Sequence, residues 1–460
     1  MKLTFCGATG TVTGSRYLLR GDGGEVLVDC GLFQGYKQLR LRNWEAPPFA
    51  PKQVEAVLLS HAHLDHSGWI PRLVKAGFAG RVHCTPGTRD LCALLLPDSG
   101  HLQEEEAAYA RRKGFSKHDP PQPLYTVADA LAAMRAFRVV SRTRAVHVAG
   151  LEASFLHAGH LLGASSILVR GAGVSVMFSG DLGRDNDPIL VPPAPFAGAD
   201  YLVVESTYGN RSHDAGDREA RLADVITRTV ERGGIVVVPA FAVGRAQEIL
   251  LHIARLRAAG RIPDVPVYLN SPMASHAGET LANHVGEHRL TAAQCAELTR
   301  IARIVATPEE SAALNARRDP MIIVAASGMV TGGRVVHHVK AFAPDPRNTL
   351  LFCGYQAGGT RGATIVAGSP TVRIHGEDIP VRAEVVSLDG FSAHADADGL
   401  IAWMRAARTP PLCTFITHGE PDAADALRQR IERELGWNVR VPDYRDRYEL
   451  TASGARSAGR

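Results

Sequence analysis

Three histidines and one aspartate stand within six residues of this chain, in the run His61-Ala62-His63-Leu64-Asp65-His66 that follows the apolar residues 54–60. Imidazole and carboxylate side chains at this density are ligands that suit Zn²⁺. His61 and His63 lie two apart in an extended segment and point the same way, whereas Asp65 and His66 come after the chain has turned. One ion cannot easily take all four groups from so short a loop. The spacing therefore indicates two neighbouring metal sites, with a solvated histidine-rich loop as the alternative.

Further candidate ligands follow several later strands, at the point where each strand is expected to end. His160 follows residues 151–156, Asp181 follows the run Val176-Met177-Phe178-Ser179-Gly180, and His394 and His418 stand in loops near the C-terminus. Loops held by a rigid sheet are the usual place for catalytic groups, because the scaffold fixes their geometry. A lone histidine is more often packed or exposed than a ligand. Several in equivalent loops, beside residues 61–66, indicate one shared site.

The elements that must position these loops change in style along the chain. Short strands rich in β-branched residues are expected at 3–6, 17–19, 25–29, 54–60, 145–156, 166–170, 174–179 and 201–205, with helices at 89–113 and 127–137. From about residue 208 helices and strands alternate, as is typical of βαβ units around a parallel sheet. Strands at 383–388 and 412–417 then lead into the histidine-bearing loops, and residues 453–460 are expected to fray. The predicted domains are 1–207, an insertion over 208–380, and 381–460.

The composition excludes several classes of protein but does not identify one. The chain has 460 residues, of which 45% are hydrophobic and 21% charged, as in ordinary globular proteins of several domains. The net charge of +4 is too small to prove a polyanionic partner, and no block of like charge forms a basic arm. The seven cysteines include no Cys-x-x-Cys pair, which argues against a disulfide framework or a thiolate zinc site. No signal-peptide core or membrane-spanning run is found, so we expect a cytoplasmic protein without membrane contact.

Taken together, the motifs resemble the metallo-β-lactamase superfamily and, within it, the β-CASP RNA-processing nucleases, the group of the cleavage and polyadenylation specificity factor endonuclease subunit and its bacterial and archaeal homologues. Leu27-Val28-Asp29-Cys30-Gly31 resembles the first motif and residues 61–66 the second. The remaining motifs are matched, in the order of the family, by His160, Asp181, Glu205 (motif A), His394 (motif B) and His418 (motif C). The resemblance implies an α/β fold, a metallo-β-lactamase αββα sandwich with a β-CASP domain inserted between Glu205 and His394.

The resemblance also implies two Zn²⁺ ions per chain. One would be held by His61, His63, His160 and Asp181, and the second by Asp65, His66, Asp181 and His418, with Asp181 bridging. Two ions about 3.5–4 Å apart can generate a hydroxide near neutral pH and clamp a phosphoryl group during in-line displacement. Asp65 could also orient the hydroxide. Asp29 is expected either to fix a ligand imidazole from the second shell or to be a buried turn aspartate.

Two further groups of residues have roles to explain. Glu205 paired with His394 would stabilise its imidazolium form, which suits binding of a scissile phosphate or protonation of the leaving oxygen. The alternative is that this pair merely locks two domains together. Ser327 and Gly328 join an expected strand to a helix, and the resemblance implies a substrate-phosphate contact there. An ordinary βα turn that needs glycine is the alternative.

Some tempting motifs are not assigned chemistry. The glycine-rich residues 7–14 precede a strand and not the helix that a dinucleotide-binding loop requires, and residues 354–362 lack a Walker lysine. His157, His337 and His338 lack expected partners and are interpreted as non-catalytic.

These features predict a zinc-dependent ribonuclease that hydrolyses RNA phosphodiester bonds, an endonuclease for which 5′ exonuclease activity stays open. Single-stranded RNA is the expected partner. The resemblance favours RNA over DNA, because the family's DNA-repair branch typically has an apolar residue where this chain has His418. Whether the protein forms a homodimer stays open. One alternative is a small-molecule metallo-hydrolase of the thioesterase or lactonase type, which would need neither the inserted domain nor His394. Another is a non-catalytic RNA-processing subunit, although all seven ligand positions here are filled.

Overall fold

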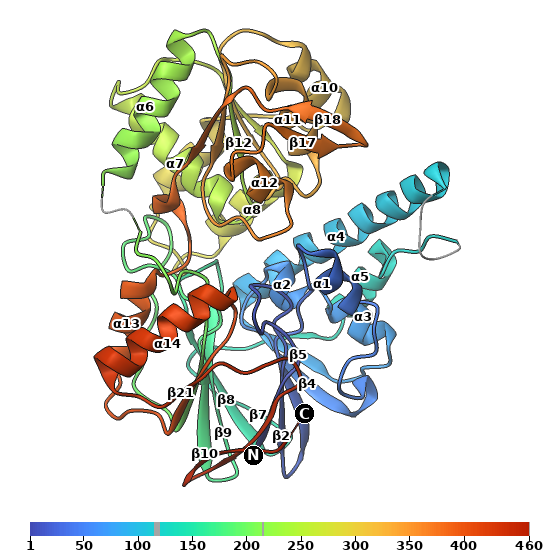
Figure 1. Ribbon diagram of the computed structural model, residues 1–460, viewed down its shortest axis with the longest axis vertical. Coiled ribbons are helices and arrows are strands. Elements are labelled where there is room, and N and C mark those ends of the chain that lie inside the picture. Colours follow the sequence, from blue (N-terminus) through green and yellow to red (C-terminus); the bar gives the residue numbers. More distant parts are fainter. Residues whose placement is uncertain (115–119, 214–215, 460) are drawn as a thin grey trace. The chain divides into compact units, whose positions relative to one another are not determined.

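The chain forms two compact units in a computed structural model that describes residues 1–114, 120–213 and 216–459. The first unit combines Met1–Ser212 with His394–Arg460, and the second is His213–Ala393 (Figure 1). Both ends of the chain therefore build one unit, and the other is inserted between them.

Two sheets form the first unit. The eight-stranded sheet has the order β23-β22-β1-β2-β3-β4-β5-β6. Its strands are β1 (Lys2–Phe5), β2 (Tyr17–Gly21), β3 (Gly24–Val28), β4 (Val54–Leu58), β5 (Arg81–Cys84), β6 (Phe137–Val139), β22 (Arg447–Thr451) and β23 (Gly454–Ser457). The seven-stranded sheet has the order β21-β20-β11-β10-β9-β8-β7. It contains β7 (Val146–Val148), β8 (Leu151–His157), β9 (Ser165–Gly171), β10 (Val174–Phe178), β11 (Tyr201–Val204), β20 (Cys413–Ile416) and β21 (Val439–Arg440).

Alternate residues of the two sheets face each other and form the main core of this unit. Phe5 and Phe415, one from each sheet, are fully buried with ring centroids 5.2 Å apart. This alternation is the two-residue period expected of strands that bury one face in a sandwich. Burying an aromatic or aliphatic side chain of this size contributes about 1.5–3 kcal/mol each, so the sheet interface is the main source of the unit's stability.

Helices cover the outer faces of both sheets (Figure 1). Leu400 and Met404 of α13 and Leu427 and Ile431 of α14 pack against the outer face of the seven-stranded sheet. The other helices belong to the side of the eight-stranded sheet. The helices of this unit are α1 (Lys37–Arg42), α2 (Leu64–Ser67), α3 (Ile70–Lys75), α4 (Pro86–Lys113), α5 (Val127–Met134), α13 (Ala397–Arg405) and α14 (Pro421–Leu435). The predicted αββα sandwich is confirmed.

Parallel pairing explains why distant loops of the first unit meet. In one sheet β3, β4 and β5 run parallel, and in the other β10, β11 and β20 run parallel. The carboxyl ends of parallel strands lie at one edge of a sheet, which is where open α/β folds place their sites. The loops that follow β4, β10, β11 and β20 are therefore gathered at the sheet edges, and they carry most of the predicted ligands.

The second unit has a six-stranded sheet in the order β14-β13-β15-β12-β16-β19, and every pair in it is parallel. The alternation of helices and strands predicted this arrangement. Its strands are β12 (Val236–Pro239), β13 (Val267–Asn270), β14 (Arg303–Ile304), β15 (Ile322–Ala325), β16 (Thr349–Phe352) and β19 (Glu384–Ser387), beside the hairpin of β17 (Thr371–Ile374) and β18 (Glu377–Pro380). The helices are α6 (Arg218–Glu231), α7 (Arg245–Ala258), α8 (Pro272–Asn283), α9 (Ala292–Arg300), α10 (Pro308–Ala316), α11 (Arg334–Phe342) and α12 (Arg361–Val366).

Several elements differ from their predicted extents. The strand expected at 145–156 is a hairpin, because Ala149 and Gly150 adopt positive φ angles of 51° and 70° and reverse the chain between β7 and β8. The helix expected at 127–137 ends at Met134, since Phe137 begins β6 and pairs with β5. Residues 453–460 were expected to fray, but β23 pairs with β22. β19 pairs with β16 and so lies in the second unit, although we expected it within 381–460.

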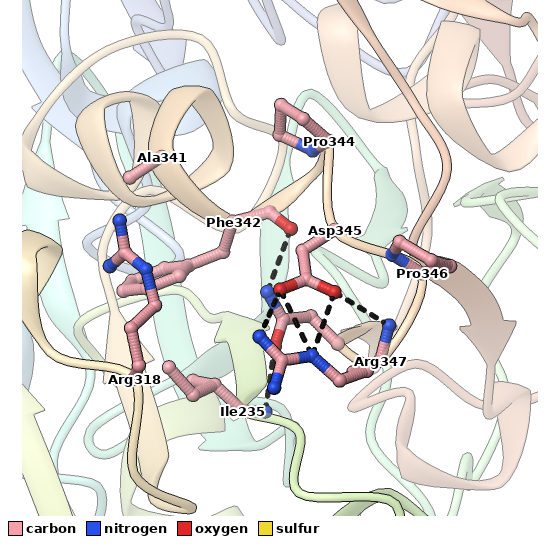
Figure 2. Close-up of a pocket in the computed structure, with 9 residues that line it drawn as sticks. Ile235, Arg318, Ala341, Phe342, Pro344, Asp345, Pro346 and Arg347 are labelled. Carbon is pink, nitrogen blue, oxygen red and sulfur yellow. Dashed lines mark hydrogen bonds and ion pairs between the residues drawn. The ribbon is translucent and has the colours of Figure 1, made fainter.

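One cavity of the second unit, of about 360 Å³, lies beside the turn that follows α11 (Figure 2). Its carboxylate, Asp345, is already paired with Arg347 at 2.7 Å. The other charged group in the lining is Arg318, and the remaining residues are mostly apolar. This lining offers no set of metal ligands. Among the residues that the structure describes, no helix is both long and apolar enough to cross a lipid bilayer.

A buried histidine in the second unit predicts that this unit loses stability in acid. His338 Nδ1 donates to Asn315 Oδ1 at 2.7 Å, and its Nε2 accepts from Asn270 Nδ2 at 2.6 Å. This network fits the neutral ring, since a second ring proton would face the amide N–H of Asn270. Burial, together with the charges of His337 and Arg334, lowers the pKa of His338 from 6.5 to about 4.

As the pH falls below 6.5, the unfolded chain takes up a proton at residue 338 that the folded chain refuses until about pH 4. The stability held by the neutral ring is therefore complete above pH 6.5 and is lost toward pH 4. Between about pH 6.5 and about pH 5 the loss is about 2 kcal/mol. We expect urea unfolding of His338→Asn to lack this part of the pH dependence. His276→Asn, at an exposed histidine of α8, is the control and should keep the wild-type slope; equal slopes for all three proteins would contradict the assignment.

Candidate metal centre

The predicted metal-binding run changes from strand to helix within a few residues. β4 ends at Leu58, and α2 begins at Leu64. His61 and His63 therefore lie in the extended connection, whereas Asp65 and His66 lie on the helix. Ser67 Oγ donates to the carbonyl oxygen of Ala62 at 2.8 Å and closes this turn. The local fold thus splits the four candidate ligands into two pairs that face different neighbours.

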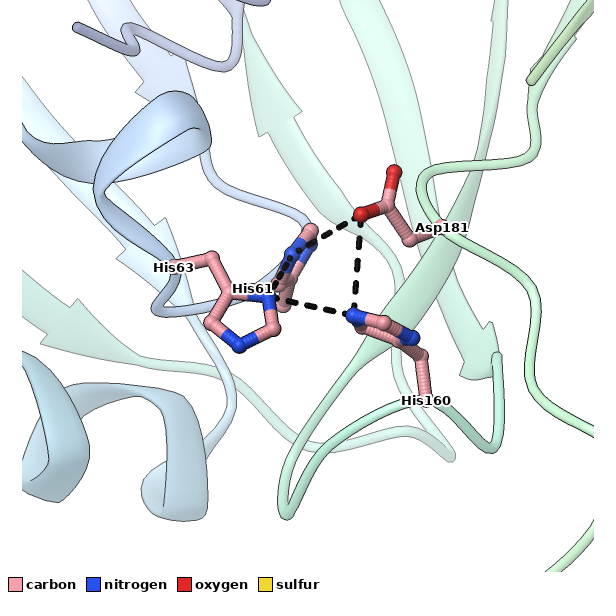
Figure 3. A group of neighbouring side chains, drawn as sticks. All are labelled: His61, His63, His160 and Asp181. Carbon is pink, nitrogen blue, oxygen red and sulfur yellow. Dashed lines mark hydrogen bonds and ion pairs between the residues drawn. The ribbon is translucent and has the colours of Figure 1, made fainter. Parts of the chain in front are cut away.

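One group of ligand atoms converges around His63 (Figure 3). Its Nδ1 lies 3.2 Å from His61 Nε2 and 3.1 Å from His160 Nε2. Asp181 Oδ2 lies 3.4 Å from His61 Nε2 and 3.6 Å from His160 Nε2. One ligand atom from each of these four side chains lies within 4.8 Å of the others. Neutral imidazoles cannot satisfy one another in this arrangement with a single proton each, but a shared cation would satisfy all of them.

A second group forms on the other oxygen of Asp181. Its Oδ1 lies 3.1 Å from His66 Nε2, which lies 3.0 Å from His418 Nε2. His418 Nε2 in turn lies 3.2 Å from Asp65 Oδ2. Each oxygen of Asp181 therefore faces one group, which is the geometry that a bridging carboxylate needs. The structure brings all seven predicted ligands together, although their binding of metal stays a prediction.

The protonation of these side chains fits a pair of cations. Burial lowers the pKa of His61 and His160 well below the ordinary value and that of His63 to about 4, so these rings are neutral and offer lone pairs. Burial also lowers the pKa of His66, but Asp181 and Asp29 raise it by more, to well above its usual range. The second group therefore holds an excess of negative charge that favours a positive ion. Nitrogen and carboxylate donors in sets of four are the ligands that Zn²⁺ takes.

Neighbouring polar groups fix the orientation of the ligand rings. Asp29 Oδ2 accepts from His66 Nδ1 at 2.7 Å, which leaves His66 Nε2 to face Asp181. Ser60 Oγ lies 3.0 Å from His61 Nδ1 and donates to the same Asp29 oxygen at 2.8 Å. Such contacts set the tautomer of a metal-binding histidine and raise its basicity. Of the two alternatives expected for Asp29, these contacts favour the one in which its carboxylate fixes a ligand imidazole.

Two orienting residues were missed by the sequence analysis. Ser60 holds both His61 and Asp29, and Thr207 Oγ1 lies 3.2 Å from His418 Nδ1. A hydroxyl beside a ligand is too common in sequences to single out. The available signal was position alone, since Ser60 directly precedes His61 and Thr207 stands two residues after Glu205.

His394 lies at the edge of the first ligand group and is held by Glu205. Its Nδ1 lies 3.0 and 3.1 Å from the two carboxylate oxygens of Glu205, and its Nε2 lies 4.0 Å from Asp181 Oδ2. Glu205 is fixed in turn, since it accepts from the backbone N–H of Leu182 at 2.6 Å and of Thr207 at 3.3 Å. Burial lowers the pKa of His394, but Glu205 and then Asp181 raise it to about 8. The ring is therefore held rigidly and charged near neutral pH.

Ser327 and Gly328 lie in the second unit, and their phosphate contact stays a prediction. Ser327 Oγ accepts from the backbone N–H of Thr331 at 3.1 Å and of Gly332 at 3.4 Å, so it is engaged within its own loop. A Cβ at residue 328 would lie 2.9 Å from the backbone nitrogen of Phe241. Close packing of two backbones therefore explains the need for glycine at this position.

Comparisons with known proteins agree with the fold. The chain matches the model of the metallo-beta-lactamase superfamily over residues 9–207 and that of the Beta-Casp domain over 246–365. Residues 378–442 match the Zn-dependent metallo-hydrolase RNA specificity domain. Two packed sheets with converging histidines and aspartates are therefore those of a metallo-hydrolase. The chain belongs to the β-CASP family of the metallo-β-lactamase superfamily, as its motifs predicted.

Three curated relatives are similar to most of this chain. It is 36% identical to ribonuclease TTHA0252 of Thermus thermophilus, over 93% of this chain and 95% of that protein. It is 32% identical to transcription termination factor FttA of Methanosarcina mazei, over 96% and 70%, and 31% identical to an RNase J-like protein of Methanocaldococcus jannaschii, over 91% and 92%. A solved structure of a protein of unknown function from Enterococcus faecalis has a TM-score of 0.53 at 14% identity, covering 98% of this chain and 99% of that one. The last likeness concerns the fold alone.

Proposed function

We propose that the protein is a zinc-dependent ribonuclease that hydrolyses phosphodiester bonds of single-stranded RNA. The observation that carries this proposal is Asp181, whose two oxygens face two separate groups of histidine and aspartate ligands. The RNA specificity domain matched over residues 378–442 and the ribonuclease among the relatives support RNA as the substrate. A one-metal site would need no carboxylate shared in this way.

His61, His63, His160 and Asp181 would hold one Zn²⁺, and Asp65, His66, Asp181 and His418 the other. Two ions bound there would lower the pKa of an attacking water and neutralise charge on the phosphate. Asp29, Ser60 and Thr207 would keep the ligand rings in the required tautomers. Asp65, the most exposed of the carboxylates at 18%, would also accept a hydrogen bond from the nucleophile and orient it.

His394 would act on the opposite end of the scissile bond. Because Glu205 accepts from Nδ1, the Nε2–H of the charged ring would be the group that meets a phosphate oxygen or the leaving oxygen. Burial lowers the pKa of His394, but Glu205 and then Asp181 raise it to about 8, which favours the protonated ring that a proton donor needs. The side chain is 15% exposed, so substrate can reach it.

Labelled RNA tests this proposal directly. Wild-type protein, His63→Ala and the control His147→Ala, an exposed histidine of β7, would be incubated with RNA labelled at the 5′ end and separately at the 3′ end. We expect the wild type and the control to cleave the RNA, single-stranded DNA to be cut much more slowly, and His63→Ala to be inactive. Cleavage by His63→Ala at the wild-type rate would contradict the two-zinc mechanism. Internal fragments would identify an endonuclease, and mononucleotides released from the 5′ end an exonuclease.

A further inference from the structure

Aromatic rings and guanidinium groups alternate in a column that runs from the interior of the first unit to its surface. Each arginine carbon lies within 6 Å of a ring centroid, the range of cation–π attraction. The successive distances are 4.3 Å for Trp69–Arg16, 5.2 Å for Arg16–Phe33, 5.6 Å for Phe33–Arg42, 4.5 Å for Arg42–Tyr444 and 5.1 Å for Tyr444–Arg445. The first three members are buried, Arg42 and Tyr444 are half-buried, and Arg445 is exposed. The outer end of the column is therefore open to a further planar group.

The inner end of the column is fixed to Gly31, which packs against the loop that carries the candidate metal ligands. Arg16 donates from Nε and Nη2 to the carbonyl oxygen of Gly31 at 2.9 and 2.6 Å. A Cβ on Gly31 would collide with the carbonyl oxygen of Asp65, and Leu32 N–H donates to Leu64 O at 2.8 Å. The column therefore belongs to the same rigid scaffold as the candidate metal ligands, although none of its members contributes a ligand.

The segment that supplies Phe33 and Arg42 also carries exposed aromatic and basic side chains. Tyr36 is 52% exposed and Trp44 is 37% exposed, and they are the two aromatic residues among the exposed large hydrophobics of the described chain. Residues 36–45 contain three lysines or arginines against one acidic residue, and residues 440–447 contain three arginines against two aspartates. Asn43 holds the segment in place, since its side chain accepts from Phe33 N–H at 2.9 Å and donates to Phe33 O at 2.8 Å.

The backbone of Arg445 is strained, although nothing in the arginine side chain favours this conformation. Its φ is 75°, in the left-handed region where a side chain is unfavourable and glycine is at ease. The backbone there is fixed, because Arg445 N–H donates to Phe5 O at 2.8 Å. A residue that keeps a costly conformation while presenting an exposed guanidinium is a candidate for function.

We propose that this arginine–aromatic surface, made of Tyr36, Lys37, Arg40, Trp44, Tyr444 and Arg445, binds single-stranded RNA apart from the metal centre. Bases of a single strand stack on exposed aromatic rings and guanidinium planes, and lysines and arginines contact the phosphates between them. Tyr, Trp and Arg also favour protein interfaces, but lysine is depleted there, and the excess of cations here suits a polyanion. The inference rests on the proposed ribonuclease activity, since the bound strand would be the substrate.

Binding without cleavage tests this surface. The anisotropy of a fluorescein-labelled oligouridine of about 20 nucleotides would be measured with the full chain in EDTA, for the wild type, Arg445→Gly and Trp44→Ala. We expect each substitution to raise Kd about tenfold, since each removes one stacking plane. Arg445→Gly should not lower the thermal midpoint, because glycine relieves the positive φ. Trp44→Phe keeps a ring and should bind within about twofold of the wild type, as should Arg170→Ala, an exposed arginine of β9 used as the matched control for charge.

Turnover separates this surface from the metal centre. KM for the same RNA should rise in Arg445→Gly and Trp44→Ala, while hydrolysis of bis(p-nitrophenyl) phosphate, too small to reach the surface, should not change. If the wild type binds RNA but Kd and KM are unchanged in both variants, the inference is overturned. The surface would then be assigned to binding of a protein partner. A wild type that binds RNA but never cleaves it would instead contradict the proposed ribonuclease and leave this surface supported.

Discussion

Asp181→Ala should purify without zinc at either ligand group, whereas His63→Ala and Asp65→Ala should each retain one ion per chain. The reason is that one oxygen of Asp181 faces His61 and His160 and the other faces His66, so that removing this carboxylate deprives both groups of a ligand and of negative charge. His63 and Asp65 each belong to one group. A carboxylate so deeply buried, at 2% exposure, cannot be replaced by a water-exposed neighbour.

Zinc per chain, measured by atomic emission after dialysis against metal-free buffer, reports the result. We expect RNA cleavage by Asp181→Ala to fall by about three orders of magnitude or more, because a water without metal keeps a pKa far above neutral pH and is a poor nucleophile there. Asp200→Asn is the matched control, since Asp200 is another carboxylate of the first unit and accepts from Ser175. It should keep two ions and full activity. Two ions in Asp181→Ala would contradict the bridging role.

The residues of the candidate metal centre could be predicted from the sequence because each of them stands in a local and recognisable setting. His61, Asp181 and His418 each follow a mostly buried strand, which appears as a short apolar run, whereas His160 follows β8, in which buried and half-buried residues alternate. Their convergence was not visible in the same way. His66 and His418 are 352 residues apart, and only the parallel pairing of β11 with β20 brings the loop of His418 beside the others. The resemblance to the family supplied the grouping of the candidate ligands, but not this pairing of strands.

Elements with weak apolar signals were the ones the sequence could not reveal. β23 is Gly-Ala-Arg-Ser, which has no hydrophobic alternation and forms because β22 offers an open edge. α2 has four residues and is held by the ligand loop itself, beyond the reach of any periodicity. Ser60 and Thr207 were not predicted for a related reason, since the role of a single hydroxyl can be recognised only from the imidazole ring that it contacts in the fold.

The arginine–aromatic surface shows the same limit. Its members come from two stretches of sequence, residues 36–44 and 444–445, and neither is a recognisable nucleic-acid motif. The net charge of +4 did not reveal this surface, because the excess of basic residues is local. Stacking order and backbone strain are properties of the folded chain alone.

His394→Ala should keep both zinc ions and yet cleave RNA about 10²–10⁴-fold more slowly, the contribution typical of a positioned acid or base. Glu205 is the partner that keeps the ring charged and oriented, so Glu205→Gln should also lower kcat, by a smaller factor. If Glu205 acts through His394, the double variant should be no slower than His394→Ala alone. Additive losses would mean that Glu205 has a separate role. His147→Ala again provides the control for loss of an imidazole from the surface of the first unit.

The leaving group distinguishes the two roles that His394 could have. A p-nitrophenyl diester expels an anion that needs no proton, so a variant lacking the acid should lose little activity on it while losing most on RNA. If His394 instead binds the phosphate, both substrates carry that phosphate and both rates should fall together. Wild-type rates on both substrates in His394→Ala, with a lowered thermal midpoint, would assign the Glu205–His394 pair to structure. The 3.0 Å contact to a carboxylate at 1% exposure and the remaining 15% exposure of the imidazole side chain favour catalysis, because a purely structural pair would have no reason to keep part of this side chain exposed beside the candidate metal ligands.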